Sequence, residues 1–337
     1  MNYKKKEKVL VCIICQTRGY KITWKNFNKY VIKNLGADLA VCVAEKKTNN
    51  QFYENAKFIW SFKDRKDYTK LFNYSQKKIL KKKKINKNFH NWKKILKIKD
   101  SWLSGLGDYP MKYGSGAISI YFRWFLLQKI LKEKLHLKYD RFIITRSDFI
   151  WTSYHPKLGN LNSDYIWFPN EEKYKGYTDR HAVLSKKNFY DYLNLLEPIL
   201  LHTNKLFNLM KNKNNWNLES YQKFYLHLMG YKDRIKFFPY VMYLAREANY
   251  KTRFFPGAGD YSFKHKYFIK YHKEYIYSLV MYWLLDNKKD YKFFLLYHLI
   301  YKIFYKVLFR FPFFIKKFFN QNKINRKFDL DFILKKM

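Results

Sequence analysis

Apolar residues follow two patterns in the first part of the chain, short unbroken runs and one longer stretch with helical spacing. Residues 8–15 form an unbroken apolar run that ends in the polar turn 16–19. Residues 24–35 then repeat apolar positions at helical spacing, and Gly36 follows as a helix-ending glycine would. A second run, apolar except for Asp38, covers residues 37–44. Because such runs are typical of strands buried on both faces, we predict a strand, a helix and a second, parallel strand.

The same two patterns continue to about residue 255 and predict further elements. Strands are expected at residues 58–62, at 142–144, at 163–168 and just after His181. Helices are expected at residues 117–135, at 186–210 after a Ser185 cap, and between an Asn217 cap and Gly230. This alternation predicts an α/β fold in which a mostly parallel central sheet is flanked by helices.

One apolar run carries charged residues. Residues 142–144 read as a buried strand, and Arg146 and Asp148 follow at its carboxyl end, where α/β sheets present functional side chains. A spacing of two places both side chains on the same side of a continuing strand, so a cation and a carboxylate would point into one crevice. A structural ion pair at the end of a strand explains the same two residues, and both interpretations stay open.

Other polar residues lie where a ligand could reach them. The turn 16–19 follows the first strand, but neither the glycine-rich motif of dinucleotide sites nor a P-loop is present. Arg123 falls within the apolar pattern of the helix at 117–135. The sequence Asp179-Arg180-His181 directly precedes a strand. Glu219 lies in the first turn of a predicted helix, where a carboxylate also suits the helix dipole.

The charge of the chain indicates an anionic partner. The 337 residues include 68 Lys and Arg against 26 Asp and Glu, a net charge of +42, and 21% are aromatic. Nucleic acid and an anionic membrane surface both attract such a protein, although a biased amino-acid usage also enriches lysine. Lysines are dense in a predicted insertion at 72–100, which we read as solvated or as a contact for a membrane or an acceptor.

Residues 266–337 differ in composition from residues 1–265, which we predict to form one main domain. Aromatic and basic residues alternate there, and residues 293–319 are apolar on nearly every helical turn yet carry recurring lysines. No unbroken apolar stretch is long enough for a transmembrane helix. We therefore expect a helical tail that lies on a membrane surface with its lysines at the phosphates; a helix that covers the sheet is the alternative.

The cysteines and the N-terminus indicate a reducing compartment. Cys12, Cys15 and Cys42 all lie in predicted buried strands, where thiols behave as small apolar groups. Cys12 and Cys15 form a C-x-x-C pair, but no second pair follows, so we expect core residues rather than a redox or zinc site. The apolar run after Lys8 has no cleavage site of the secretory kind. We expect a cytoplasmic protein.

The order of these motifs resembles that of a known family, the GT-A type nucleotide-sugar glycosyltransferases of bacterial lipopolysaccharide and capsule synthesis. Members carry a strand ending Tyr-Asp-x-x-Ile-x-x-Arg-x-Asp in place of the Asp-x-Asp motif, and Tyr139, Asp140, Arg146 and Asp148 match it. The opening strand and turn, the Asp-Arg-His sequence and the Glu-Ser pair at a helix start are also similar. The resemblance covers residues 8–255 and implies a GT-A-like fold.

The resemblance implies a hexosyltransferase that moves a sugar from a nucleotide diphosphate to a glycan or lipid-linked acceptor in cell-surface polysaccharide synthesis. Asp148 would bind Mn²⁺ or Mg²⁺, and the presence of Arg146 where the usual motif has its first Asp leaves metal dependence open. Asp179 and Glu219 are candidates for the catalytic base or for sugar binding. The expected donor-binding residues are Gln16, Thr17, Arg18, Arg123, Arg146, Asp148, Arg180 and His181.

Two other classes of protein explain part of the sequence. A nucleic-acid-binding protein would account for the charge and the aromatic residues, but no zinc-finger, RNP1 or KH motif is present, so no nucleic-acid partner is expected. A non-catalytic scaffold on a membrane surface would account for the tail but not for Arg146 and Asp148. We favour an enzyme that is peripheral on the inner face of the membrane.

Overall fold

The computed structural model describes residues 7–14, 16–45, 48–85, 91–98, 101–107, 115–170, 174–247, 260–262 and 266–286. The chain divides into two compact units, Met1–Trp283 and Leu284–Met337. Nearly all described residues belong to the first unit, and the following elements are those of that unit. The unit extends past residue 265, where the sequence predicted the end of the catalytic domain, because Tyr267–Ile269 pair with an earlier strand.

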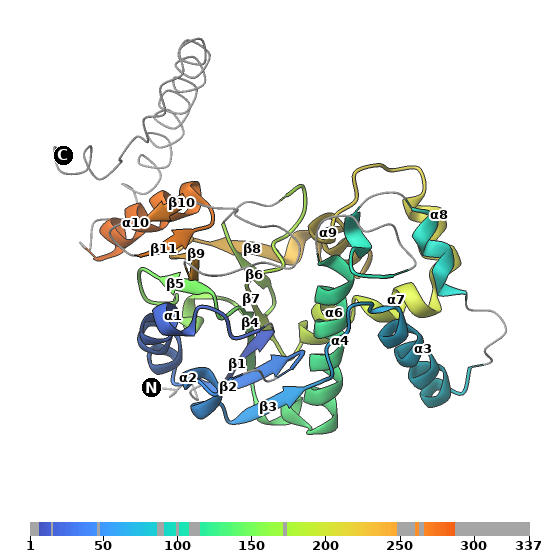
Figure 1. The fold of residues 1–337 in the computed structure, drawn as a ribbon, viewed down its shortest axis with the longest axis horizontal. Helices are drawn as coiled ribbons and strands as arrows, with labels where there is room; N and C mark the ends of the chain where they lie inside the picture. Colours follow the sequence, from blue (N-terminus) through green and yellow to red (C-terminus); the bar gives the residue numbers. More distant parts are fainter. Residues whose placement is uncertain are drawn as a thin grey trace, which may run out of the picture. The chain divides into compact units, whose positions relative to one another are not determined.

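A seven-stranded sheet in the order β3-β2-β1-β4-β7-β6-β8 forms the centre of the unit (Figure 1). Its strands are β1 (Val9–Ile14), β2 (Asp38–Val43), β3 (Phe58–Ser61), β4 (Arg141–Thr145), β6 (Ile166–Pro169), β7 (Ala182–Ser185) and β8 (Ile235–Phe238). The pairs β3–β2, β2–β1, β1–β4 and β6–β8 are parallel, whereas β7 is antiparallel to both β4 and β6. The predicted α/β fold with a mostly parallel sheet is confirmed.

Strand β1 lies between β2 and β4, buried on both faces. Cys12 is fully buried, with Ala40 and Ile144 as its register partners on the two sides. Cys12 and Cys42 are buried free thiols, and burial raises the pKa of Cys12 well above its ordinary value. Reduced core cysteines are therefore confirmed at these two positions. Cys15 lies outside the described residues.

Helices α4 (Gly116–Lys132), α6 (Phe189–Leu193) and α9 (Leu218–Leu228) cover one face of the sheet. Their apolar residues form one buried cluster with alternate residues of the central strands, such as Leu10 and Phe142. Helix α1 (Tyr20–Phe27) continues as a π-helical segment, η1 (Asn28–Lys33), and lies beside β5 (Figure 1). The helices predicted at 24–35 and 117–135 are confirmed, although α1 begins earlier.

A second, smaller sheet takes over where β4 ends. The chain turns at Arg146–Asp148 and enters β5 (Phe149–Trp151), which pairs with β9 (Met242–Glu247). This four-stranded sheet has the order β10-β11-β9-β5, and all of its pairs are antiparallel. The expectation of a single strand continuing through Arg146 and Asp148 is therefore wrong. The apolar residues on both sides of the turn read as one strand in the sequence. Those before the turn belong to the large sheet, and those after it belong to the small sheet.

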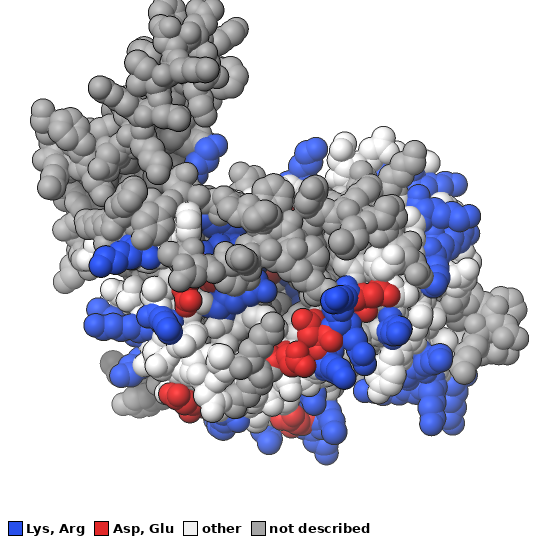
Figure 2. All heavy atoms as spheres, in the orientation of Figure 1, with Lys and Arg blue, Asp and Glu red and all other residues white. Residues whose placement is uncertain are grey.

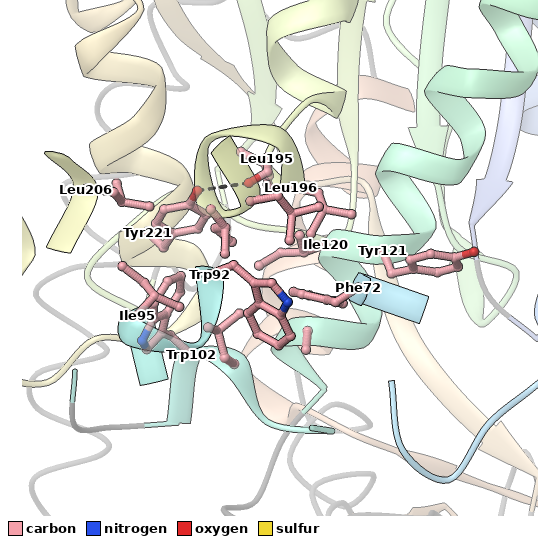
Figure 3. Close-up of a cluster of buried hydrophobic side chains, with 14 of the residues drawn as sticks. Phe72, Trp92, Ile95, Trp102, Ile120, Tyr121, Leu195, Leu196, Leu206 and Tyr221 are labelled. Atoms are coloured by element: carbon pink, nitrogen blue, oxygen red, sulfur yellow. Dashed lines mark hydrogen bonds between the residues drawn. The ribbon is translucent and has the colours of Figure 1, made fainter. Parts of the chain in front are cut away.

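A helical module packs beside the large sheet around its own core (Figure 3). It consists of α3 (Thr69–Lys83), the turns η3 (Trp92–Lys97) and η4 (Ser101–Leu103), α7 (Leu196–Leu201) and α8 (Thr203–Met210), together with the inner side of α4 and α9. The hydroxyl of Tyr221 donates to the Leu195 carbonyl at 2.9 Å, as the dashed line in Figure 3 shows. The predicted insertion at 72–100 contributes buried residues such as Trp92 to this core, so it is not wholly solvated.

The helix predicted at 186–210 is wrong as a single element. The structure has three shorter helices there, α6, α7 and α8, and Asn188 rather than Ser185 lies at the first N-cap. The first break, at Asn194, has a physical cause. Pro198 cannot donate to the Asn194 carbonyl four residues earlier, and its ring would clash with that carbonyl in a continuous helix.

In the part of the chain that the structure describes, no helix is long and apolar enough to cross a bilayer. The last described helix is α10 (His272–Asp286). The expected interfacial segment at 293–319 lies outside the described residues.

Candidate active site

The candidate site lies at the edge of the large sheet where its parallel strands β1 and β4 end. The turn 16–19 follows β1, and Arg146 follows β4. Because β7 runs antiparallel to β4, the beginning of β7 lies at this same edge, and Asp179-Arg180-His181 directly precede it. The topology therefore brings three of the predicted segments to one edge. In α/β sheets, ligands bind at the edge where the parallel strands have their carboxyl ends.

Ser147 connects two of these segments. Its hydroxyl lies within hydrogen-bond distance of the carbonyl oxygens of Gln16, at 2.9 Å, and Arg18, at 3.2 Å. Thr23 of α1 donates to the Ser147 carbonyl at 2.7 Å, and Gly19 provides the left-handed backbone, with φ of 67°, that begins the helix. Ser147, a residue that carried no sequence signal, thus holds the turn 16–19 next to Arg146 and Asp148.

The three predicted residues of that turn differ in exposure. Thr17 is buried, and its hydroxyl accepts from the side-chain amide of Asn50 at 3.0 Å. Gln16 is half-buried and Arg18 is exposed. Of the three, Gln16 and Arg18 have side chains that a ligand at this edge could contact, whereas Thr17 supports the turn.

Arg146 and Asp148 form a two-point ion pair. Nε of Arg146 donates to Oδ1 of Asp148 at 2.8 Å, and Nη2 donates to Oδ2 at 2.6 Å. The Asp148 side chain is 4% exposed and that of Arg146 is 24% exposed, so only the arginine reaches solvent. The two side chains meet as predicted. They meet as the structural ion pair that the sequence left open.

Two further cations lie near Asp148, and neither was predicted. Ala245 N on β9 donates to the Asp148 carbonyl at 2.9 Å, which places the next residue, Arg246, beside the turn. Lys270 N, just after β11 (Tyr267–Ile269), donates to the Leu244 carbonyl at 2.9 Å. Both cationic residues are half-buried.

The electrostatics reflect this excess of positive charge. Burial acts to raise the pKa of Asp148, but the charge and hydrogen bonds of Arg146 and the charges of Arg246 and Lys270 hold it below its usual range. Burial, together with the like charges of Arg146 and Arg246, lowers the pKa of Lys270 even though Tyr271 acts to raise it. Among the residues that the structure describes, three cations thus act on the carboxylate of Asp148.

These surroundings do not fit a divalent metal ion at Asp148. Mg²⁺ and Mn²⁺ prefer oxygen ligands, above all carboxylates, but both oxygens of Asp148 already accept from Arg146. A metal would have to displace Arg146 and lie among the charges of Arg246 and Lys270. Among the residues that the structure describes, no group of three or more His, Cys, Asp or Glu could hold an ion.

A second cluster at the same edge contains the predicted carboxylates Asp179 and Glu219, both half-buried. Burial, followed by the charge of Asp179, raises the pKa of Glu219 to about 7, against the lowering effects of Arg180 and Arg123. A backbone contact fixes Glu219, because Tyr177 N donates to its carbonyl at 3.2 Å. Gly176 permits this approach, since a Cβ there would lie 1.9 Å from the same carbonyl oxygen.

Arg123 on α4 is fully buried and contacts the segment that carries Asp179. Its Nη2 donates to the Asp179 carbonyl at 3.0 Å, and its Nη1 donates to Gln222 Oε1 on α9. Gln222 in turn donates to the Thr178 carbonyl at 3.2 Å. Arg123 was predicted to bind the donor. In the structure its guanidinium hydrogen-bonds to the segment before β7 and to α9, and so holds that segment in place.

Arg180 is also engaged within the protein. It forms a buried two-point pair with Glu274 of α10, at 3.1 and 2.9 Å, and Tyr240 donates to the same carboxylate at 2.8 Å. The Tyr271 ring joins the two clusters, because its centroid lies 5.0 Å from the Arg180 guanidinium and 4.6 Å from Lys270 Nζ. The two groups of charges are thus neighbours.

His181 lies in the core, away from the solvent side of the edge. Its Nδ1 is 2.9 Å from the Thr145 hydroxyl, and its ring packs against Trp151, His155 and Phe238. Burial lowers the pKa of His181 well below its ordinary value, so the ring is neutral. The structure does not bring this residue together with the other predicted donor-binding residues.

Sequence reasoning missed Arg246, Lys270 and Tyr271 for one reason. They lie on or after strands of the second sheet, in a stretch where basic and aromatic residues are so frequent that none of them stands out. If residues 242–247 and 267–269 had been recognised as antiparallel strands of one sheet with β5, these three residues would have been expected near β5.

The comparisons with known proteins give one kind of similarity. The sequence matches no protein-family model and no curated protein. Among solved structures it is similar to core-mannan synthase A (CmsA/Ktr4) from Aspergillus fumigatus in its Mn/GDP form, with a TM-score of 0.38 and 9% sequence identity, over 80% of this chain and 84% of that chain. A similarity of this size transfers neither residues nor an activity to this chain.

Proposed function

We propose that the protein is a glycosyltransferase that moves a sugar from a nucleotide-diphosphate donor to an acceptor hydroxyl. One observation carries the proposal, the juxtaposition at a single sheet edge of a cation-rich cluster around Asp148 and a carboxylate pair in which Glu219 has a pKa of about 7. The first cluster suits an anionic diphosphate, and the second suits proton transfer near neutral pH. The α/β fold, which places these side chains at the carboxyl ends of its parallel strands, is suited to such a donor.

In the proposed reaction, the acceptor oxygen forms a bond to the anomeric carbon while the bond from that carbon to the diphosphate oxygen breaks. The electron pair leaves with the diphosphate, and the hydroxyl proton passes to the Glu219 carboxylate. Asp179 keeps that carboxylate basic through its negative charge, and Arg123 holds Asp179 in place. This assignment applies to an inverting transfer, in which a base acts on the acceptor directly.

Donor binding tests the proposal most directly. A thermal-shift panel of UDP- and GDP-sugars, with and without MnCl₂, should raise the melting temperature with at least one donor, because a ligand that binds only the folded state stabilises it. Release of free nucleotide in the presence of a membrane extract would then report turnover. A panel in which no nucleotide or nucleotide sugar stabilises the protein would contradict the proposed function.

The acceptor and the location remain parts of the proposal. We propose a lipid-linked or glycan acceptor in cell-surface polysaccharide synthesis, reached from the inner face of a membrane. The last part of the predicted tail, residues 284–337, would attach the enzyme, since Lys270 and Tyr271 of residues 266–283 lie at the site. The net charge of +42 supports this. Lysines and arginines also gather over α3 and α8 on the face drawn in Figure 2. Flotation with vesicles of phosphatidylglycerol should exceed flotation with neutral vesicles and should weaken with salt.

A further inference from the structure

We propose that Arg146, Arg246 and Lys270 bind the diphosphate of the donor and stabilise it as it leaves, in place of a divalent metal. The inference rests on the proposed function, since it states how the same site holds its donor. Asp148 then acts as a positioning residue that fixes Arg146 rather than as a metal ligand.

The positions of the three cations support this role. They come from the β4–β5 turn, from β9 and from the end of β11, and backbone hydrogen bonds between these strands fix their relative places. Arg246 lies opposite Phe268 in the β9–β11 register. Glu247, the next residue of β9, points to the opposite face of the strand and does not follow Arg246 to the site.

The chemistry of a leaving diphosphate requires positive charge placed before the reaction begins. Arginine can donate two parallel hydrogen bonds to phosphate oxygens, and lysine supplies a compact charge. Asp148 fixes Nε and Nη2 of Arg146, and the arginine side chain is 24% exposed, so a ligand can reach it from the solvent side. A diphosphate would also relieve the mutual repulsion of the three cations, and groups fixed in this way need no reorganisation when charge develops.

A different basic site is the alternative that the test must separate. The helical module has a surface cavity of about 680 Å³ between η3 and the start of α8, lined in part by Lys93, Lys97 and Lys205. Its described lining residues include His202 but no carboxylate, and neither Asp179 nor Glu219 is among them. We therefore assign the donor to the sheet edge and use Lys205 as a control.

Calorimetric titration of the full chain with UDP and with GDP, in excess EDTA and in excess MnCl₂, tests the inference. The affinity for whichever nucleotide binds should be the same in both buffers. Arg246→Gln and Lys270→Met should each weaken binding in EDTA by about tenfold or more, as expected for the loss of one charge-assisted hydrogen bond. Arg246→Lys and Lys270→Arg, which keep the charge, should recover part of the affinity.

Matched controls remove charge elsewhere. Arg234→Gln and Lys138→Met change exposed residues that precede β8 and β4, at the opposite edge of the sheet, and Lys205→Met changes the second cavity. All three should bind nucleotide as the unmodified protein does. If a variant at the site melts early, the salt dependence of binding by the unmodified protein supplies a second measurement, and binding that does not weaken with salt would count against the cations.

The outcomes separate this inference from the proposed function. Binding that is lost in EDTA and restored by Mn²⁺ would overturn the inference and leave a nucleotide-dependent transferase standing. Weakened binding in Lys205→Met with unchanged binding in Arg246→Gln would move the nucleotide to the other cavity and overturn it as well. No binding of either nucleotide in any buffer would remove the proposed function together with the inference.

Discussion

Two carboxylate environments lie at the same sheet edge and differ in the sign of their surroundings. Asp148 is enclosed by cations, which hold its pKa below the usual range. Glu219 is buried beside a second carboxylate, and its pKa is raised to about 7. A carboxylate of the first kind stays ionised and orients a neighbour, whereas one of the second kind exchanges a proton near neutral pH. Asp148 therefore suits the positioning of Arg146, and Glu219 suits proton transfer.

The largest expected effect comes from removing the proton-transfer side of this contrast. Glu219→Gln should lower kcat by about 10² to 10⁴-fold, the usual contribution of a general base, and should leave nucleotide affinity nearly unchanged. Glu54→Gln, at an exposed position of α2 (Gln51–Glu54), is the matched control. Turnover at the level of the unmodified enzyme in Glu219→Gln would show that the base lies elsewhere.

Removing the positioning carboxylate should have a smaller effect on a different parameter. Asp148→Asn releases Arg146 from its two-point contact, so we expect nucleotide affinity to fall by about tenfold while the pH profile of kcat keeps its shape. Asp148→Glu should recover part of the affinity. A change in the pH profile, with affinity intact, would instead make Asp148 a participant in proton transfer.

The raised pKa of Glu219 can be adjusted without removing the residue. Asp179→Asn removes the negative charge that raises this pKa, so the pH at which kcat rises should move to lower values, by about one unit. At acidic pH the variant should be the faster enzyme in relative terms. A profile that moves to higher pH would exclude Asp179 as the neighbour that sets the pKa. Full pH profiles of both proteins measure this.

The smallest expected effect is on stability. The folded-state pKa of Glu219, about 7, lies above its ordinary value, so the folded protein binds this proton more tightly than the unfolded chain. Stability from this group is present below the unfolded pKa and is lost as the pH rises toward 7. Glu219→Gln should therefore melt at a higher temperature than the unmodified protein above pH 7, and this advantage should shrink toward pH 4 to 5. Thermal melts across that range test it.

The sequence was sufficient for the elements whose cause is local. The unbroken run at β1 and the helical spacing of α4 both follow from the burial that these residues undergo. The Asn217 cap of α9 was also predicted, and the structure adds a capping box with Ser220. Each of these signals lies within a few residues of the element that it defines.

The remaining features depend on contacts between distant segments. Nothing near Asp148 in the sequence indicates that Ala245 pairs with this turn or that Leu244 pairs with Lys270. The sheet that joins these segments is assembled from residues about a hundred apart. The direction of β7 was equally invisible, since a strand of four buried residues has the same pattern whether it is parallel or antiparallel. Arg146 and Asp148 could be recognised, but their partners could not.

Gly176 has a consequence for how this protein can diverge. Its Cα lies against the carbonyl of Glu219 so closely that any larger residue would push the start of α9 away from the segment before β7 that carries Asp179. The position carries no charge and touches no substrate in the proposed reaction. In a saturation library selected for transfer, glycine should nevertheless be the residue retained at 176, while an exposed position such as Glu54 accepts many residues. Over long evolutionary times we expect glycine at this position to be retained in active proteins of this fold longer than the charged residues beside it.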